Sequence, residues 1–206
     1  MLRSVNYKTQ RVVNYKIVLI PILLAIAIQI QGCRAIWQKP DTIIENLKLD
    51  STTIIADIGA GDGYFTFRFQ KAIGSAGKVY AIEIDYQKYE LLVREVEERG
   101  SSTVFPILGQ ANDPLIPEKA DILFLCHAFH HIEDRVNYFI GLKKYLKEGG
   151  RVAIVELDRV PWYLGSLQEH QTPIAKIELE MSQAGYFLIE ASTCLPLQNF
   201  LVFRIK

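Results

Sequence analysis

The sequence predicts an α/β fold: a doubly wound, mostly parallel seven-stranded sheet with an antiparallel C-terminal hairpin at its edge. Three observations predict it. From residue 40 onward, short apolar runs alternate with segments of helical periodicity. A glycine-rich turn follows the first run, and two runs near the C-terminus are separated by only a short turn. Alternating strands and helices are typical of a parallel sheet, and closely spaced runs are typical of a hairpin.

Seven apolar runs are the expected strands. The first five are apolar on both faces and rich in β-branched or aromatic residues, as parallel strands covered by helices on both sides usually are. These five span 53–58, 78–84, 103–108, 121–126 and 151–157, and the hairpin runs span 186–193 and 200–205.

The segments between the runs are amphipathic. Their apolar residues recur every three or four positions, which places them on one face of a helix. They are Phe65, Phe69 and Ile73 in the first segment, Tyr89, Leu92, Val93 and Val96 in the second, Val136, Phe139 and Ile140 in the third, and Ile174, Ile177 and Met181 in the last.

Composition limits the classes of partner. The 206 residues include 23 basic and 23 acidic side chains. Nucleic-acid binders usually carry a basic excess, because phosphate contacts supply most of their affinity. No nucleic-acid partner is therefore expected. The three cysteines, Cys33, Cys126 and Cys194, form no C-x-x-C pair, so neither a disulfide scaffold nor a structural zinc site is indicated.

The strongest functional signal is the turn A-D-I-G-A-G-D-G at 56–63, between the first strand and the first helix. Glycines there let a ligand approach the backbone and the helix N-terminus. Glu83 ends the second strand, twenty residues after Gly63, where a carboxylate can accept both hydroxyls of a ribose.

The details of this turn favour a cationic ligand over a dinucleotide. The dinucleotide pattern has glycine or alanine where this chain has Tyr64. Asp57 and Asp62 would repel a pyrophosphate. S-adenosyl-L-methionine (SAM) carries an ammonium and a sulfonium group and no phosphate, so an acidic loop suits it better.

This turn resembles the first motif of class I SAM-dependent methyltransferases, and the segment Glu83-Ile84-Asp85 resembles their second-strand acid. The segments 127–135 and 146–157 resemble the later motifs of the ubiquinone/menaquinone-biosynthesis methyltransferases. The resemblance covers about residues 40–205. It implies the Rossmann-like methyltransferase fold and SAM as cofactor.

The resemblance also implies roles for individual residues. Gly59, Ala60 and Gly61, with Asp57 beside them, would hold the methionine half of SAM, Glu83 would hold the ribose, and Ile84 would flank the adenine. Gln110 and Ala111 match the place where the family commonly has an aspartate for the adenine amino group; the Gln110 amide oxygen can accept the same bond. Cys126 and His127 match the end of the fourth strand, which faces the methyl group, although a cysteine in an apolar run is also typical of a buried thiol.

Three histidines follow the fourth strand: His127, His130 and His131. His127 and His131 are the candidate catalytic residues, because imidazoles titrate near neutral pH and this loop borders the expected pocket. A structural role remains the alternative, since many methyl transfers need no base. No metal site is expected, because H-x-x-H-H lacks the spacing of a helical ligand face. His170, with Trp162 and Tyr163 before it, suggests a substrate lid or a packed aromatic hinge.

Residues 1–33 resemble a targeting segment. Four basic and no acidic residues precede an apolar run at 17–28, and the segment ends in Gly32-Cys33, similar to a lipoprotein cleavage box. The prediction is a signal or membrane-anchor segment at 1–33 and a methyltransferase domain at 34–206, hence a membrane-associated protein. The alternatives are an uncleaved anchor, a helix covering a cytoplasmic domain, or an unused upstream start. The charges favour export of the domain after the apolar run, whereas SAM is made inside cells.

The sequence thus predicts a SAM-dependent methyltransferase acting on a small-molecule or lipid-like acceptor. The alternative from another class is a membrane-displayed SAM-binding domain without turnover. An oxidoreductase using a nucleotide is opposed by Tyr64 and the acidic loop.

Overall fold

The structure is a computed structural model of the chain, and it describes residues 35, 38–161, 170–193 and 195–206. Contacts divide the chain into two units, Met1–Ile36 and Trp37–Lys206. The expected signal or anchor at 1–33, and also Trp162 and Tyr163 of the expected lid or hinge, lie outside the described residues. Within the described ranges, none of the helices is both long and apolar enough to span a bilayer.

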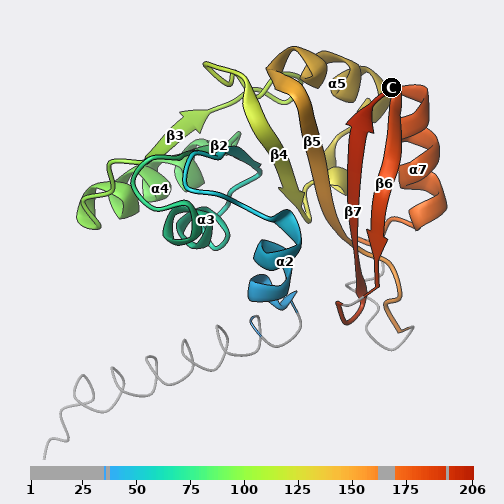
Figure 1. Cartoon of the computed structure of the whole chain (residues 1–206), viewed down its shortest axis with the longest axis horizontal. Coiled ribbons are helices and arrows are strands. Elements are labelled where there is room, and N and C mark those ends of the chain that lie inside the picture. The colour runs from blue at the N-terminus through green and yellow to red at the C-terminus, as the bar shows by residue number, and fades with distance from the viewer. Residues whose placement is uncertain (1–34, 36–37, 162–169, 194) are drawn as a thin grey trace, which may run out of the picture. The chain divides into compact units, whose positions relative to one another are not determined.

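The second unit contains one seven-stranded sheet in the order β3-β2-β1-β4-β5-β7-β6 (Figure 1). The first five strands pair in parallel, whereas β7 is antiparallel to both β5 and β6. This confirms the predicted fold class, including the terminal hairpin. The strands are β1 (Ile54–Ile58), β2 (Lys78–Glu83), β3 (Val104–Leu108), β4 (Ala120–Cys126), β5 (Leu146–Leu157), β6 (Tyr186–Ser192) and β7 (Gln198–Ile205).

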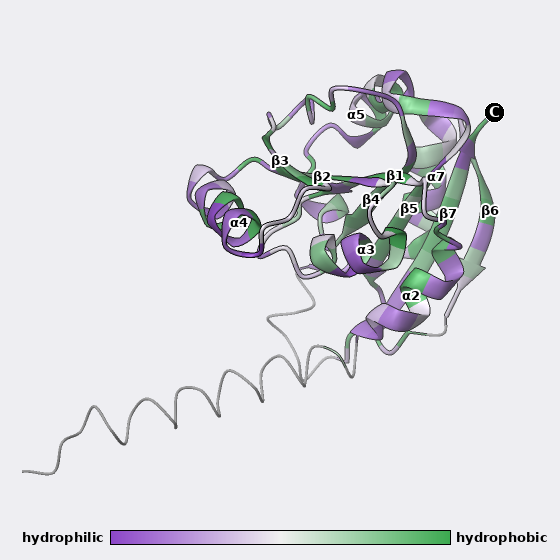
Figure 2. Cartoon of the chain, turned by 60° about the vertical axis from the view of Figure 1, so that its left-hand side comes forward, coloured by the Kyte–Doolittle hydropathy of each residue, from purple (hydrophilic) through white to green (hydrophobic). Residues whose placement is uncertain are grey.

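Helices cover both faces of this sheet, with α2, α3 and α4 on one face and α5 and α7 on the other (Figure 2). Each face has its own apolar core cluster, which explains why the parallel strands are apolar on both sides. The helices are α2 (Pro40–Leu47), α3 (Thr66–Ile73), α4 (Tyr86–Glu98), α5 (Arg135–Leu142) and α7 (Ile174–Gln183), with short 3₁₀ turns η1 (Phe129–His131) and η2 (Lys143–Tyr145).

Two elements differ from the sequence-based expectation. Helix α2 was not anticipated, although Ile43 and Leu47 on one of its faces are buried against α3. It is only eight residues long, and its apolar stripe is too short to stand out in the sequence. Strand β5 begins at Leu146, five residues earlier than predicted, because the ladder with β4 continues past a register shift between Ala120 and Ile122.

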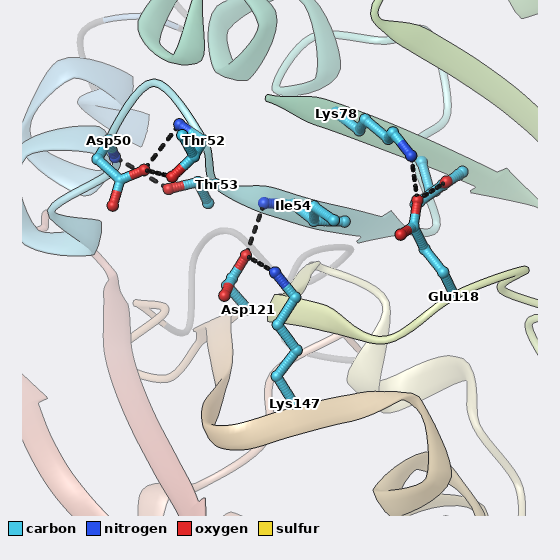
Figure 3. Close-up of polar contacts among 9 residues, drawn as sticks. Asp50, Thr52, Thr53, Ile54, Lys78, Glu118, Asp121 and Lys147 are labelled. Carbon is cyan, nitrogen blue, oxygen red and sulfur yellow. Dashed lines mark hydrogen bonds and ion pairs between the residues drawn. The ribbon is translucent and has the colours of Figure 1, made fainter. Parts of the chain in front are cut away.

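The amino ends of the strands are joined by polar contacts (Figure 3). The Asp121 carboxylate accepts hydrogen bonds from the Ile54 amide and the Lys147 ammonium, both at 2.8 Å. Glu118 accepts from Lys78 and from the Tyr80 hydroxyl, both at 2.5 Å. These contacts connect β1, β2, β4 and β5 at the amino ends of the strands. The candidate active site described below lies at the opposite, carboxyl ends.

The strand order reverses between β1 and β4: β2 and β3 extend to one side, and β4 and β5 to the other. In open parallel sheets, the crevice at the carboxyl ends of such a pair is the usual ligand site.

Candidate active site

The glycine loop leaves β1 at this reversal point. Gly59, Gly61 and Gly63 have φ values of 80°, 58° and 75°, in the left-handed region that favours glycine. The amides of Gly59 and Ala60 both donate to the Ile82 carbonyl of β2 at 2.9 Å, which fixes the loop against the neighbouring strand.

Two of these glycines have different reasons to lack a side chain. A Cβ at Gly59 would lie 2.9 Å from the Cβ of Ala128, so glycine is needed there for packing within the protein. A Cβ at Gly61 would meet no protein atom within 4 Å. Gly61 borders the pocket described below, so its open side is the approach that a ligand would use.

Glu83 ends β2 beside this loop and is 6% exposed. One carboxylate oxygen accepts from the Gly61 amide at 3.0 Å, and the other from the amides of Ile84 and Asp85 at 2.9 and 3.1 Å. The carboxylate is therefore held by backbone donors, with its position set by two loops. Such a fixed acceptor suits the two hydroxyls of a ribose.

A pocket of about 810 Å³ lies at the carboxyl ends of β1, β2 and β4. Eight of the eleven site residues predicted from the sequence line it together. They are Gly59, Gly61, Glu83, Ile84, Gln110, Ala111, His127 and His131.

The other three predicted residues, Asp57, Ala60 and Cys126, do not line this pocket. The Asp57 carboxylate is 2% exposed and accepts from the Thr66 hydroxyl at 2.6 Å, so it holds the start of α3. Ala60 and Cys126 pack on the core cluster that includes α2 and α3. Side chains of neighbouring residues in these segments point to different sides, and sequence similarity alone does not separate them.

Gln110 lies in a turn after β3, where its backbone pairs with Asp113 at 2.8 and 3.2 Å. Asp113 in turn accepts from Lys144 at 2.7 Å and from Tyr145. Burial alone would raise the pKa of the Asp113 carboxyl, but these hydrogen bonds outweigh burial and lower it. The turn is thus tied to η2, and it presents Gln110 and Ala111 to the pocket.

His127 has a φ of 54°, which is unusual for a residue with a side chain. Its amide donates to the Val155 carbonyl at 2.9 Å, and its Nε2 lies 2.8 Å from the Gln198 side-chain oxygen. Nδ1 lies 3.7 Å from the Glu156 carboxylate. Acceptors therefore face both ring nitrogens, which favours a positioning role for His127 over proton abstraction.

His131 is the histidine that is exposed in the pocket wall. Burial of part of the ring lowers its pKa, and the neighbouring His130 and His170 lower it further. Its imidazole is consequently neutral at pH 7 and carries a lone pair. Burial likewise raises the pKa of the Tyr138 phenol in the same wall, so this side chain stays protonated.

Sequence reasoning missed two residues of this region. The sequence patterns assign no separate role to His130, and none to Glu156 near the end of β5. The Glu156 carboxylate is 1% exposed and accepts from the His130 amide at 3.1 Å, with His130 Nδ1 at 3.0 Å. A carboxylate at the end of a buried strand was the signal that could have identified it.

The pocket wall is acidic. Glu83, Asp85, Glu133 and Asp134 line it, and Lys88 is the cation among its described residues. This charge balance fits a ligand with positive groups and no phosphate, as SAM is. Gly61 provides open backbone and Glu83 a fixed carboxylate, so the residues present suit the SAM amino acid and ribose.

Comparison with known proteins supports this interpretation. A family model described as "Methyltransferase domain" matches residues 56–154, from the glycine loop to β5. The "Probable cobalt-precorrin-6B C(15)-methyltransferase (decarboxylating)" of Sulfurisphaera tokodaii is 33% identical over 142 residues, which cover 65% of this chain and 72% of that protein. A tRNA U34 carboxymethyltransferase of Desulfotalea psychrophila is 31% identical over 61% of this chain, but only 38% of that protein is covered.

The fold has a close structural counterpart. A SAM-dependent methyltransferase of Aquifex aeolicus superposes with a TM-score of 0.74 at 21% identity, covering 82% of this chain and 90% of that one. The described pocket lies within the matched family region and at the edge of the sheet where such folds bind ligands. The chain therefore belongs to the class I SAM-dependent methyltransferases, and its cofactor is S-adenosyl-L-methionine.

Proposed function

We propose that this enzyme methylates a small-molecule or lipid-like acceptor bound at the histidine side of the pocket. One observation carries the proposal: residues of the segment after β4 and of α5 line the same pocket as the cofactor residues. His127, Ala128, His131, Ile132 and Tyr138 form this wall of the pocket. A volume of about 810 Å³ lies in the upper part of the range for small-molecule sites, which leaves room for an acceptor beside the cofactor.

The character of the wall supports a small, partly apolar acceptor. Ile132 and Ala128 offer apolar surface, and Tyr138 offers a neutral hydroxyl. The resemblance of segments 127–135 and 146–157 to the ubiquinone/menaquinone-biosynthesis enzymes supports the same class.

A nucleic-acid acceptor has less support. The Desulfotalea psychrophila relative is named for tRNA, but its match leaves most of that protein uncovered. In this chain the pocket wall contains four carboxylates and one lysine, and the formal net charge is zero. A phosphate backbone would be repelled at this rim.

The chain's own residues have separable tasks in this reaction. SAM supplies a methyl group bound to a sulfonium, and the thioether that remains after transfer is an excellent leaving group. In-line positioning of acceptor and methyl group therefore accounts for much of the rate. Gly61 and Glu83 hold the cofactor in place. His131, exposed in the acceptor wall, assists loss of the acceptor proton. His127 shapes the wall, because its ring lies 2.8 Å from the Gln198 side-chain oxygen and 3.7 Å from the Glu156 carboxylate.

Turnover and binding measurements test this division. S-adenosylhomocysteine formation is followed with soluble quinols, catechols and aliphatic alcohols, and with unmodified tRNA as a further acceptor. His131→Ala should keep its SAM affinity and lose about 100-fold in turnover, the usual contribution of a positioned acid or base. His127→Ala, also in the wall, should affect turnover less.

Three results would contradict the proposal. Methylation of tRNA but of none of the small acceptors would show that the acceptor is a nucleic acid and not a small molecule or lipid. Full turnover in both histidine variants would leave positioning as the only catalytic effect. SAM binding without product on any acceptor would favour the alternative, a membrane-displayed SAM-binding domain without turnover.

We further propose that residues 1–33 attach the protein to a membrane. Support comes from the sequence alone: a basic segment, the apolar run 17–28 and Gly32-Cys33. Cys33→Ser in cell fractionation separates the routes. Release of the variant, or an uncleaved precursor, supports lipidation at Cys33; unchanged retention at unchanged mass supports the helix as anchor. Soluble wild-type protein that starts at Met1 would contradict both and favour a cytoplasmic protein.

A further inference from the structure

Three histidines converge beside the acceptor wall. One potential ligand nitrogen each from His130, His131 and His170 lies within 4.8 Å of the other two. His130 and His131 belong to η1, directly after β4, whereas His170 precedes α7 by only a few residues. Two segments separated by about forty residues thus contribute to one cluster.

The position of His170 is set by the backbone beside it. Gln171 pairs with Leu157 at the end of β5, and the Thr172 amide donates to the Leu157 carbonyl at 2.9 Å. Strand β5 also carries Glu156, which holds His130. The same strand end therefore orients both sides of the cluster.

The spacing of the ring nitrogens fits a small metal ion. His130 Nε2 and His170 Nδ1 share a hydrogen bond at 3.2 Å, which a bound ion would replace. Two imidazole nitrogens bound tetrahedrally to zinc, each at 2.0–2.1 Å, are about 3.4 Å apart. The ligand nitrogen of His131 lies within 4.8 Å of the other two, so its ring would have to move closer to complete a zinc site.

Glu156 provides the support that metal-binding histidines usually have. Its buried carboxylate lies 3.0 Å from His130 Nδ1. A proton on Nδ1 therefore donates to Glu156 and leaves the lone pair on Nε2, directed at the cluster. Carboxylate–histidine pairs of this kind fix the ring and raise its basicity toward a metal.

We propose that His130, His131 and His170 bind one divalent ion of the zinc class at the rim of the acceptor pocket, with a fourth coordination position open. Imidazole ligands suit zinc, copper, iron and nickel, and three protein ligands with an open position are typical of a catalytic zinc site. The sequence did not indicate this, because His170 is remote and Glu156 lies on another strand.

The open position gives the site a role at the acceptor, and this step rests on the proposed function. His131 lines the pocket, so an ion bound to it lies beside the acceptor. With the ion bound, His131 would assist loss of the acceptor proton as a metal ligand and not as a base. The ion would lower the pKa of a hydroxyl that coordinates to it, and the proton would pass to solvent. The acceptor class is then a hydroxyl compound, such as a phenol or an enol.

Metal titration of the full chain, prepared without a histidine tag and stripped with a chelator, tests the site. Zn²⁺ should bind with one-to-one stoichiometry in calorimetry, and Co²⁺ should give the intense visible bands of a tetrahedral site. His130→Ala and His170→Ala should weaken Zn²⁺ binding by more than about 100-fold. Glu156→Gln should weaken it by about 10- to 100-fold.

His127→Ala is the matched control, because His127 is the one histidine of the chain that lies outside the cluster. It should change Zn²⁺ affinity no more than about threefold. SAM affinity provides the check on folding, particularly for His170→Ala, since His170 is not part of the pocket wall. A His170→Ala variant that binds SAM and retains Zn²⁺ affinity would overturn the proposal, as would the absence of saturable binding in the wild-type chain.

Turnover distinguishes failure of the metal site from failure of the proposed function. Methylation of phenols that continues in a chain shown to bind no Zn²⁺ or Co²⁺ would overturn the metal site and leave the acceptor class standing. Stoichiometric metal binding lost in His130→Ala and His170→Ala supports the site even where no small acceptor is methylated.

Discussion

The two edges of the sheet use acidic side chains differently. At the amino edge, Asp121 and Glu118 each lie against a lysine, Lys147 and Lys78 respectively (Figure 3). At the carboxyl edge, Glu83 accepts only backbone donors in the described hydrogen bonds, and it faces a pocket. Acids matched by cations join strands, whereas acids held by amides remain available to a ligand. Changes at the amino edge should therefore affect stability alone, whereas changes at the carboxyl edge should also weaken SAM binding.

The largest effect is expected at Gly61. Gly61→Val places a branched side chain in the ligand's approach at a φ of 58°, so SAM affinity should fall by about 3 kcal/mol, roughly 150-fold, or more. Gly100 has the same φ, and a Cβ there also meets no atom within 4 Å, but it lies at the end of α4 and outside the pocket wall.

Gly100→Val is thus a control for backbone strain alone. Both variants should lose similar stability in urea unfolding, and only Gly61→Val should lose SAM binding in calorimetry. Equal SAM affinities in the two variants would mean that the glycine loop has a structural role only.

Glu83→Ala should weaken SAM binding by about 1.5–3 kcal/mol, the range for hydrogen bonds to a charged group. It should also cost some stability, because the amides of Gly61, Ile84 and Asp85 lose their acceptor. Calorimetry with SAM, at a temperature where the variant is folded by circular dichroism, measures the first effect. An unchanged dissociation constant would remove Glu83 from the cofactor site.

The cofactor side of the pocket could be predicted from the sequence because its residues lie in short, continuous segments of the chain. The glycine loop and Glu83 each adjoin the end of a strand, and the parallel order of β1 and β2 brings those ends together. The fold followed in the same way, from alternating strands and helices. Side-chain direction could not be predicted in this way: Asp57, Ala60 and Cys126 adjoin residues that line the pocket, but their side chains face α3 or the core.

The histidine side depends on contacts that no local pattern contains. Glu156 meets His130 across 26 residues, and His170 meets His130 across 40. Helix α2 was missed for a related reason, since its buried Ile43 and Leu47 can be recognised as core residues only from the α3 surface that they cover. Sequence patterns identify a side chain's chemistry, while the packing of distant segments decides which side chains meet.

At the amino edge, Asp121→Ala should lower the free energy of unfolding by about 1–2 kcal/mol, because the Ile54 amide and Lys147 lose a shared acceptor. Asp121→Asn keeps an oxygen for the Ile54 amide and should recover about half of the loss. Urea unfolding measures both, and SAM affinity should stay at the wild-type value. Weaker SAM binding with unchanged stability would contradict the separation of the two edges.

The smallest expected effect concerns Glu118 and acid. A hydrogen bond from Lys78, and to a smaller extent one from Tyr80, lowers the pKa of the Glu118 carboxyl. A carboxyl with a lowered pKa stabilises the folded state above its unfolded pKa of about 4.5, and this contribution is lost as the pH falls through the folded pKa. Because the side chain is 38% exposed, the contribution at neutral pH should be below about 1 kcal/mol. The difference in unfolding free energy between wild type and Glu118→Gln should be constant from pH 7 to about 5 and should shrink below about 4.5. A difference that persists undiminished to pH 3 would show that the packing of the Glu118 side chain, and not its ionisation, accounts for the difference in unfolding free energy.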